Sequence, residues 1–571
     1  MRNLIQLAKS AAVRPTRRTA SALTITAALA VAGVTAAQGN AAPSHKGKKA
    51  SHRLRYDDVF KQPKLRLGLL AVVGSQGNDK IALRLEAGNP DVIEVDVGDD
   101  GSADFSFKRR KISAIVVDAR AGDDLVRIDE SNGIFTADIP AVLAGGDGND
   151  TIAGGSGAET LLGGDGNDTI DGNAGNDRAL LGAGDDSFVW DPGDGSDTIE
   201  GQDGSDTMVF NGANVAEHVD LSANGNRLKF FRDRGNITMD TDGVERVDFN
   251  ALGGADVVTV NDLSGTDVNS VNVDLSAADD TQADRVIVNG TNGNDIVNVN
   301  GDASGVTVSG LHAAVAIQHQ QPTDELVVNG LGGNDAISAT GLAAQAITPT
   351  LDGGTGDDRI AGGPGKETLL GADGNDTIDG NGGNDLAVMG AGDDTFIWDP
   401  GDGSDTIEGQ DGSDRMVFNG AGGPEHVDLS ANGNRLKFFR DAGTITMDTA
   451  GVERVDFNAL GGADVITVND LSGTDVRSVN VDLAGALGGA AGDSAADRVI
   501  VNGTTGNDSI SVNGDASGVK ASGLTATVAV LHSEVANDSL EINTLAGTDT
   551  VDSSGLAAGA IKLLVDGVVV P

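Results

Sequence analysis

The side chains best suited to chemistry in this chain are carboxylates that recur every nine residues. From Gly145 the sequence reads GGDGNDTIA, GGSGAETLL, GGDGNDTID and GNAGNDRAL, and the sixth position of each segment is acidic. The acidic positions of this first run are Asp150, Glu159, Asp168, Asp177 and Asp186, followed by Asp197 and Asp206. Carboxylates and glycine carbonyls are hard oxygen ligands, which suit Ca2+ better than zinc or copper. The spacing therefore predicts rows of calcium ligands.

A second run of the same kind follows from an internal duplication. Residues 143–275 recur at 351–483, an offset of about 208 residues, and GDGSDTIEGQDGSD at 193–206 is identical to 401–414. The acidic positions of the second run are Asp358, Glu367, Asp376, Asp385, Asp394, Asp405 and Asp414. Residues 67–142 resemble the tail of the same unit, so the plan is a partial unit followed by two full ones. Such an array favours a structural or binding protein over a single catalytic pocket.

Glycine turns and three-residue strands must position these carboxylates. The six residues GGxGxD predict a turn, because glycine adopts backbone angles that other residues avoid. The three residues that follow predict a minimal strand with its central apolar side chain inward. Two nonapeptides then make one coil of 18 residues, which stacks Asp150 under Asp168 and Asp168 under Asp186. We expect a cation between stacked carboxylates, because they would otherwise repel each other. Asp168 would then serve two ions, and Asp150, at the edge of its block, one.

These nonapeptides resemble the RTX (hemolysin-type) calcium-binding repeat, whose pattern is GGxGxDxUx. The resemblance implies an all-β fold, a right-handed parallel β-roll or β-solenoid with Ca2+ held in the turns. The first-block ligands that it implies are Gly146, Gly148, Asp150, Glu159, Gly164, Gly166, Asp168, Asp177 and Asp186, with glycines acting through their carbonyls. The second-block ligands are Gly354, Gly356, Asp358, Glu367, Asp376, Asp385 and Asp394. Glu159, Glu367, Asn173 and Pro364 depart from the pattern.

The remaining residues of each unit predict longer coils that continue the stack. Stretches such as VERVDF and VVTVND alternate apolar and polar residues, as strands do. Their aspartates are either weaker calcium ligands or caps of turns; these are Asp256, Asp295, Asp335, Asp464 and Asp508. The repeated RLKFFRD segments (227–233 and 435–441) predict an edge strand and are the best candidates for a partner-binding patch.

The resulting organisation has seven parts. These are a signal peptide (1–42), a basic flexible linker (43–66), a partial solenoid unit (67–142), a first nonapeptide block (143–212), a spacer (213–350), a second block (351–420) and a second spacer with the C-terminus (421–571).

Composition excludes several classes of protein. The 571 residues include 86 acidic and 39 basic ones, a net charge of −47, so nucleic acid is not expected as a partner. Without cysteine, the chain has no disulfides, thiolate metal sites or cysteine nucleophiles. Short runs of Val, Ile and Leu favour a folded chain over an acidic disordered one. So much negative charge would oppose compaction unless cations are bound.

The N-terminus resembles an export signal. Arg14, Arg17 and Arg18 precede the charge-free apolar stretch 21–37, which small residues follow. We therefore expect a secreted, extracellular protein exported by the Sec route or, given the paired arginines, the twin-arginine route. The alternative is a membrane anchor, since the stretch has nearly the length of a spanning helix.

The function that these features favour is a non-catalytic, calcium-binding secreted protein with a structural, adhesive or matrix role. The chain has no H-E-x-x-H, G-x-S-x-G or P-loop motif. Besides multiple calcium ions, a cell-surface or matrix polysaccharide or protein is the expected partner. The alternatives are a carbohydrate-active enzyme or sugar-binding module on a calcium-stabilised β-helix and, less favoured, a toxin. Trp190 and Trp398 are expected to pack at the ends of ladders, and His218 and His426 to lie on the surface.

The export signal generates a prediction about the mature N-terminus. We expect cleavage between Ala36 and Ala42, where the small residues follow the apolar stretch. Mass spectrometry of protein recovered from the medium measures the cleavage point. An intact Met1 on membrane-bound protein would contradict this prediction.

Overall fold

The computed structural model describes residues 60–275 and 282–570, and these residues form an almost purely β structure. Helical residues in these ranges are confined to three short 3-10 turns, η1 (Arg109–Lys111), η2 (Arg234–Asn236) and η3 (Ala442–Thr444). In these ranges we find no helix long and apolar enough to cross a bilayer. The predicted signal peptide and linker residues 43–59 lie outside the described residues.

The chain divides into two compact units, Met1–Thr281 and Gln282–Pro571, and the strands of each unit form two sheets, called A and B. In the first unit, sheet A consists of β1 (Lys61–Arg66), β2 (Leu69–Val73), β6 (Ala114–Ala121), β8 (Ala141–Asp147), β10 (Thr160–Asp165), β12 (Arg178–Ala183), β14 (Thr198–Asp203), β16 (His218–Asn224), β17 (Arg227–Arg232), β18 (Ile237–Asp242) and β20 (Val257–Val260). Sheet B of the first unit consists of β3 (Lys80–Glu86), β4 (Asn89–Val97), β5 (Phe105–Lys108), β7 (Leu125–Asp129), β9 (Thr151–Ala153), β11 (Thr169–Asp171), β13 (Ser187–Trp190), β15 (Thr207–Asn211), β19 (Arg246–Asn250) and β21 (Ser270–Asp274).

The second unit repeats this arrangement. Its sheet A consists of β22 (Arg285–Asn289), β26 (Glu325–Asn329), β28 (Thr348–Thr355), β30 (Thr368–Asp373), β32 (Leu386–Ala391), β34 (Thr406–Asp411), β36 (His426–Asn432), β37 (Arg435–Arg440), β38 (Ile445–Ala450), β40 (Val465–Val468), β42 (Arg498–Asn502), β46 (Ser539–Asn543), β48 (Lys562–Val565) and β49 (Val568–Val569). Its sheet B consists of β23 (Ile296–Asp302), β24 (Gly305–Ser309), β25 (Ala314–Gln318), β27 (Ala336–Leu342), β29 (Arg359–Ala361), β31 (Thr377–Asp379), β33 (Thr395–Trp398), β35 (Arg415–Asn419), β39 (Arg454–Asn458), β41 (Ser478–Asp482), β43 (Ser509–Asp515), β44 (Gly518–Ser522), β45 (Thr527–Leu531) and β47 (Thr550–Leu556).

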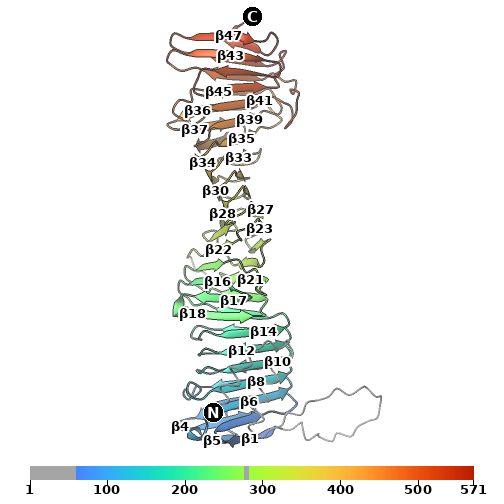
Figure 1. The fold of residues 1–571 in the computed structure, drawn as a ribbon, viewed down its shortest axis with the longest axis vertical. Helices are drawn as coiled ribbons and strands as arrows, with labels where there is room; N and C mark the ends of the chain where they lie inside the picture. Colours follow the sequence, from blue (N-terminus) through green and yellow to red (C-terminus); the bar gives the residue numbers. More distant parts are fainter. Residues whose placement is uncertain (1–59, 276–281, 571) are drawn as a thin grey trace, which may run out of the picture. The chain divides into compact units, whose positions relative to one another are not determined.

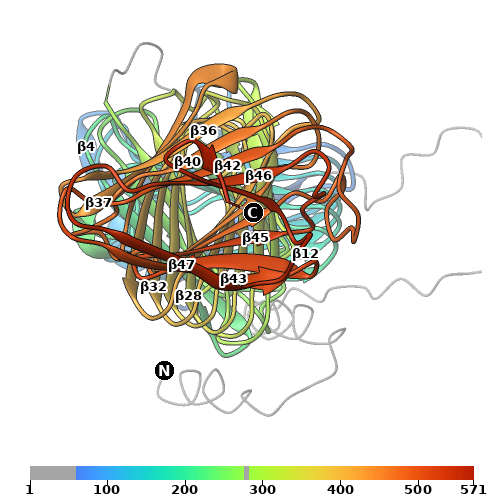
Figure 2. The same ribbon diagram turned by 90° about the horizontal axis from the view of Figure 1, so that it is seen from above.

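Within each unit the chain alternates between the two sheets, so that two nonapeptides complete one coil. Thr169 pairs in parallel with Thr151 on one side and with Ser187 on the other, at intervals of 18 residues. Figure 1 shows the corresponding strands of sheet A, β8, β10, β12 and β14, as successive rungs. Seen from the end, β42 and β46 of sheet A lie opposite β43 and β47 of sheet B (Figure 2). The predicted β-solenoid with an 18-residue coil is confirmed.

Close stacking of the turns requires glycine at particular positions. Gly164 has a φ of 134°, and a Cβ atom placed on it would overlap the carbonyl oxygen of Gly146 in the preceding coil. Gly166 stands in the same relation to Gly148. In another turn the second position, which Gly164 occupies here, holds Asn173, and that residue adopts a left-handed φ of 54°. That departure from the repeat pattern therefore preserves the turn.

The core between the sheets is a ladder of inward side chains. In the nonapeptide coils these are single aliphatic residues, such as Ile152 and Ile170, both fully buried. The ladder then becomes aromatic, with Trp190 stacked on Phe210 at 4.0 Å between ring centroids. The indole Nε1 of Trp190 donates to the carbonyl oxygen of Gly195 at 2.8 Å. The second unit repeats this pair, so the packing role expected for the tryptophans is confirmed.

The longer coils differ from the prediction in two places. Strand β17, which contains the RLKFF segment, is not an edge strand, because it pairs antiparallel with β16 on one side and β18 on the other. An inserted three-strand excursion therefore fills the sheet at this level. The end of the expected flexible linker is also ordered, since β1 (Lys61–Arg66) pairs antiparallel with β2.

The aromatic ladder generates a stability prediction. Trp190→Ala removes a fully buried side chain that stacks on Phe210, and we expect it to lower the free energy of unfolding by about 3–5 kcal/mol. Chemical denaturation in saturating Ca2+ measures the effect. Ile134→Ala is the control, because Ile134 is 61% exposed and its loss should change the value by less than about 0.5 kcal/mol. Equal effects of the two substitutions would refute the packing argument.

Candidate calcium centres

The recurring acidic residues stack in columns that are joined by hydrogen bonds. The backbone N–H of Asp150 donates to Oδ1 of Asp168 at 2.8 Å, and that of Asp168 donates to Oδ1 of Asp186 at 2.7 Å. We call the whole series the long column of the first unit; it consists of Asp79, Asp124, Asp150, Asp168, Asp186, Asp206 and Glu245. The even-numbered nonapeptides build a short column, in which Glu159, Asp177 and Asp197 are linked in the same way.

The second unit has the same two columns. Its long column consists of Asp295, Asp335, Asp358, Asp376, Asp394, Asp414 and Glu453. Its short column consists of Glu367, Asp385 and Asp405. The duplication seen in the sequence therefore extends to the individual hydrogen bonds.

The second oxygen of most of these carboxylates is buried without a hydrogen-bond partner. Asp150 and Asp168 are 2% and 1% exposed, and the Oδ2 atom of each has no donor. The same holds for Oδ2 of Asp124, Asp177, Asp186, Asp197, Asp206, Asp335, Asp358, Asp376, Asp385, Asp394, Asp405, Asp414 and Asp464. Buried polar atoms are normally paired, and a buried charge without a counter-charge is costly. These oxygens therefore require a cation or a proton.

Burial shifts the protonation of these carboxylates. Desolvation, reinforced by repulsion from the neighbouring carboxylates, raises the pKa of Asp168 to about 7 and that of Asp376 to about 7. In the short columns the same causes raise the pKa of Asp177 and of Asp385 to about 8. The backbone N–H donated to each carboxylate opposes these shifts but does not cancel them. A bound cation would reverse the balance and keep the carboxylates ionised.

Glycine carbonyls complete the donor set along each column. The carbonyl oxygens of Gly146 and Gly148 face Gly164 and Gly166 of the next turn so closely that a Cβ there would overlap them. Gly356 faces the equivalent turn of the second unit in the same way. Among the described residues, no three acidic or histidine side chains converge on one point. The donor set therefore combines single carboxylates with backbone carbonyls, a combination that fits Ca2+.

The two glutamates that replace aspartate remain in the columns. Glu159 and Glu367 are 2% exposed, like the aspartates around them. Their longer side chains fold back on their own turns, where Oε2 accepts from the N–H of Gly155 at 2.9 Å and of Gly363 at 3.0 Å. One oxygen of each glutamate is thus already paired.

The structure corrects the expected edge of the first block. Asp150 does not end its column, because the backbone N–H of Asp124 donates to its Oδ1 at 2.8 Å. The sequence reasoning missed Asp124, which lies in the turn ARAGDD (119–124), although the spacing G-x-D of that turn was a visible signal. It also missed Glu217, which is fully buried against Arg232, with Arg232 Nε donating to its Oε1 at 2.8 Å.

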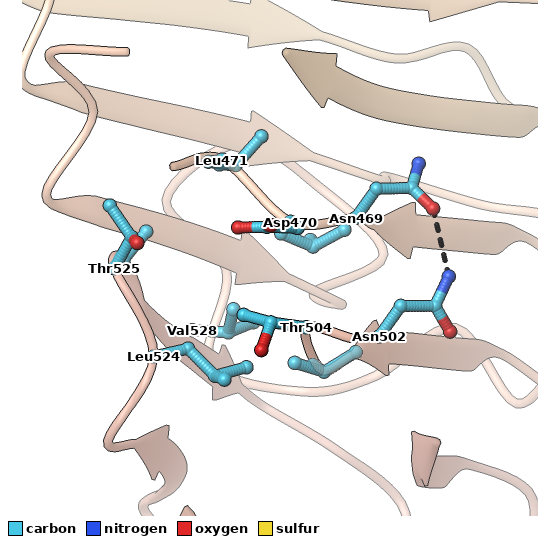
Figure 3. A pocket seen from close by; sticks show the side chains of 11 residues that line it. Asn469, Asp470, Leu471, Asn502, Thr504, Leu524, Thr525 and Val528 are labelled. Atoms are coloured by element: carbon cyan, nitrogen blue, oxygen red, sulfur yellow. Dashed lines mark hydrogen bonds between the residues drawn. The ribbon is translucent and has the colours of Figure 1, made fainter. Parts of the chain in front are cut away.

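Neither His218 nor a small cavity of the second unit contributes to the columns. His218 is exposed and its Nδ1 lies 3.1 Å from Oδ2 of Asp233, a surface pairing of the kind expected. A small cavity in the second unit is lined by residues including Asn469, Asp470, Asn502, Leu524 and Thr525 (Figure 3). Its main polar feature is the bond from Asn502 Nδ2 to Asn469 Oδ1 at 2.8 Å, which belongs to an asparagine ladder of the sheet.

Fold and site together define a parallel β-roll with stacked, buried carboxylates in glycine turns. A family model for the RTX calcium-binding nonapeptide repeat matches residues 142–169, 153–188, 193–214, 350–378, 362–396 and 401–420. The chain thus carries several copies of the RTX calcium-binding nonapeptide repeat, as the sequence predicts. These matches cover both nonapeptide runs and leave the longer coils outside.

Other comparisons add little to this assignment. No curated protein matches the chain. Among solved structures it is similar to the crystal structure of extracellular lipase LipA from Serratia marcescens, with 18% identity and a TM-score of 0.17. The match covers 60% of this chain and 43% of the lipase chain. A similarity this weak says nothing about the activity of the present chain.

The raised pKa values generate a prediction about pH. With chelator present, lowering the pH from about 8.5 to about 5.5 should increase β-structure, since protons then neutralise the columns. The sign follows because the folded pKa values of about 6 to about 8 exceed the ordinary 3.8, so this stabilisation is lost as pH rises through them.

Circular dichroism across this pH range, in chelator, measures the effect. Saturating Ca2+ serves as the control condition, because ions then take the place of protons and the pH dependence should flatten. More β-structure at alkaline than at mildly acidic pH in chelator would contradict the prediction.

Proposed function

We propose that this chain is a secreted, non-catalytic protein whose β-roll folds as it binds several calcium ions and then serves a structural, adhesive or matrix role. The observation that carries the proposal is the series of buried carboxylate oxygens without hydrogen-bond partners, of which Asp168 and Asp376 are typical. A folded chain with these oxygens ionised needs a positive charge beside each of them. The net charge of −47 also favours cation binding, because self-repulsion over the whole molecule opposes compaction.

Coupling between ion binding and folding supports an extracellular role. A site made of stacked turns exists only when the coils are stacked, so binding free energy contributes directly to folding. Extracellular calcium modules work at roughly 10⁻⁴–10⁻³ M Ca2+. The export signal that the sequence predicts fits this setting, because the protein would meet such concentrations only after leaving the cell. Folding would then follow export.

The contacts of the basic side chains support the proposal that the protein is not an enzyme. Arg227 is engaged by Asp240 at 2.6 Å and by Glu200 at 3.3 Å, and Arg232 lies over Trp190 while it pairs with Glu217. Lys229 lies over the ring of Phe231 at 5.6 Å. Such groups stabilise the strands that carry them. A surface polysaccharide or protein remains the partner class that we propose for the finished roll.

Calcium titration of the full chain tests the proposal. In chelator at about pH 8 we expect little β-structure, and millimolar Ca2+ should produce a cooperative gain, with Mg2+ a poor substitute because it demands octahedral geometry. Circular dichroism and calorimetry measure folding and stoichiometry. Asp168→Ala should raise the Ca2+ concentration at the midpoint of folding. The matched surface variant His218→Ala should leave that concentration unchanged. Identical spectra with and without Ca2+ would overturn the proposal.

A further inference from the structure

Two turns outside the matched nonapeptides have the conformation of the nonapeptide turns. They are ARAGDD at 119–124 and GLGGND at 330–335, and each immediately precedes a nonapeptide block in its long column. In the first, Arg120 and Gly122 have φ values of 87° and 118°. The corresponding glycines of the first nonapeptide, Gly146 and Gly148, have 123° and 130°. Leu331 and Gly333, at 75° and 113°, repeat this pattern in the second unit.

These two turns also stack on the blocks as the nonapeptides stack on one another. A Cβ on Gly146 would overlap the carbonyl oxygen of Arg120, and one on Gly148 would overlap that of Gly122. In the second unit, Gly354 stands in the same relation to Leu331. The backbone carbonyls that line the column inside the blocks therefore continue into these turns, whatever side chain occupies the second position.

The carboxylates of the two turns have the same unmet requirement as those inside the blocks. Asp124 and Asp335 are 3% and 2% exposed, and the Oδ2 atom of each is buried without a hydrogen-bond partner. Oδ2 of Asp335 and the carbonyl oxygen of Gly353 both lie where a Cβ atom on Gly330 would be. Inside the block, Oδ2 of Asp376 and the carbonyl oxygen of Met389 approach Gly371 in the same way.

The carboxylate that precedes Asp124 or Asp335 in each long column has its Oδ2 atom paired, so the series of unpaired oxygens ends there. Asp79 and Asp295 are half-buried, and the Oδ2 atom of each accepts a hydrogen bond from its own turn. The donors are the N–H groups of Ser75 at 2.6 Å and of Thr291 at 2.7 Å. These carboxylates are satisfied by the protein alone, so they provide matched controls for Asp124 and Asp335.

We propose that each unit binds one more Ca2+ than its nonapeptides provide, held between turns 119–124 and 145–150 in the first unit and between turns 330–335 and 353–358 in the second. Asp124 and Asp335 supply the carboxylates, and the carbonyls of the two stacked turns supply the remaining oxygens. This inference rests on the proposed function, because it requires that the blocks themselves bind Ca2+. The additional ion would hold the first coil of each block to the turn before it, as ions hold neighbouring coils inside the block.

Ion counting on the full mature chain tests the proposal. Native mass spectrometry at saturating Ca2+ should show one ion fewer for Asp124→Asn, one fewer for Asp335→Asn, and two fewer for the double variant. Asparagine keeps the Oδ1 acceptor of the column and removes the charge. The controls Asp79→Asn and Asp295→Asn should bind as many ions as the wild type. An unchanged count for the Asp124→Asn and Asp335→Asn variants would overturn the proposal.

A second measurement does not depend on the variants folding. Crystals of the wild-type protein grown with Ca2+ should show anomalous scattering between turns 119–124 and 145–150 and between turns 330–335 and 353–358. Peaks confined to the nonapeptide turns would overturn this inference while leaving the proposed function intact. A wild-type chain that binds no Ca2+ at all would overturn both, so the two failures are distinguishable.

Discussion

The structure depends on one repeated arrangement, in which a carboxylate accepts the backbone N–H of the coil before it and leaves its other oxygen buried and unpaired. The bond from Asp150 N–H to Asp168 Oδ1 at 2.8 Å fixes the spacing of neighbouring turns. The unpaired Oδ2 of Asp168 makes that spacing unfavourable unless a positive charge is supplied. The fold therefore requires a cation or a proton beside each of these oxygens. This explains why so acidic a chain can form so regular a stack.

The other features of the turn follow from that arrangement. Stacked turns bring backbone against backbone, so Gly164 and Gly166 leave room for the carbonyl oxygens of the preceding coil. The single inward side chain of each short strand, such as Ile170, provides too little apolar area to hold a coil by itself. Where the coils lengthen, the aromatic ladder that begins at Trp190 adds hydrophobic burial. Ion binding and side-chain packing thus stabilise different levels of the same roll.

The fold of the repeated nonapeptides could be predicted from the sequence, whereas the structure of the less regular segments could not. The 18-residue coil and the pairing of Asp150 with Asp168 followed from periodicity, because a fixed period leaves only one stacking register. Asp124 escaped notice because its turn, ARAGDD, replaces the first two glycines with Ala and Arg, although its backbone adopts the same angles. Strand β17 was misread as an edge because alternation in one segment does not reveal which strands flank it. The local sequence pattern specifies the conformation of a turn or strand. The position of a strand in its sheet depends on partner strands that lie elsewhere in the sequence.

The ends of the long columns show how the roll accommodates insertions. After Asp206 the chain makes the excursion β16–β18, so the next acidic residue of the column lies 39 residues further on instead of 18 or 20. That residue is Glu245, and its longer side chain accepts the N–H of Asp206 at 2.7 Å. The second unit uses Glu453 in the same place, at 2.8 Å. Because a coil contacts mainly its neighbours, such a change of length is absorbed locally and the stack continues. At the other end of the same columns an aspartate crosses a comparable distance along the chain, because the N–H of Asp79 donates to Oδ1 of Asp124, 45 residues further on. A column therefore survives an insertion with either acidic side chain.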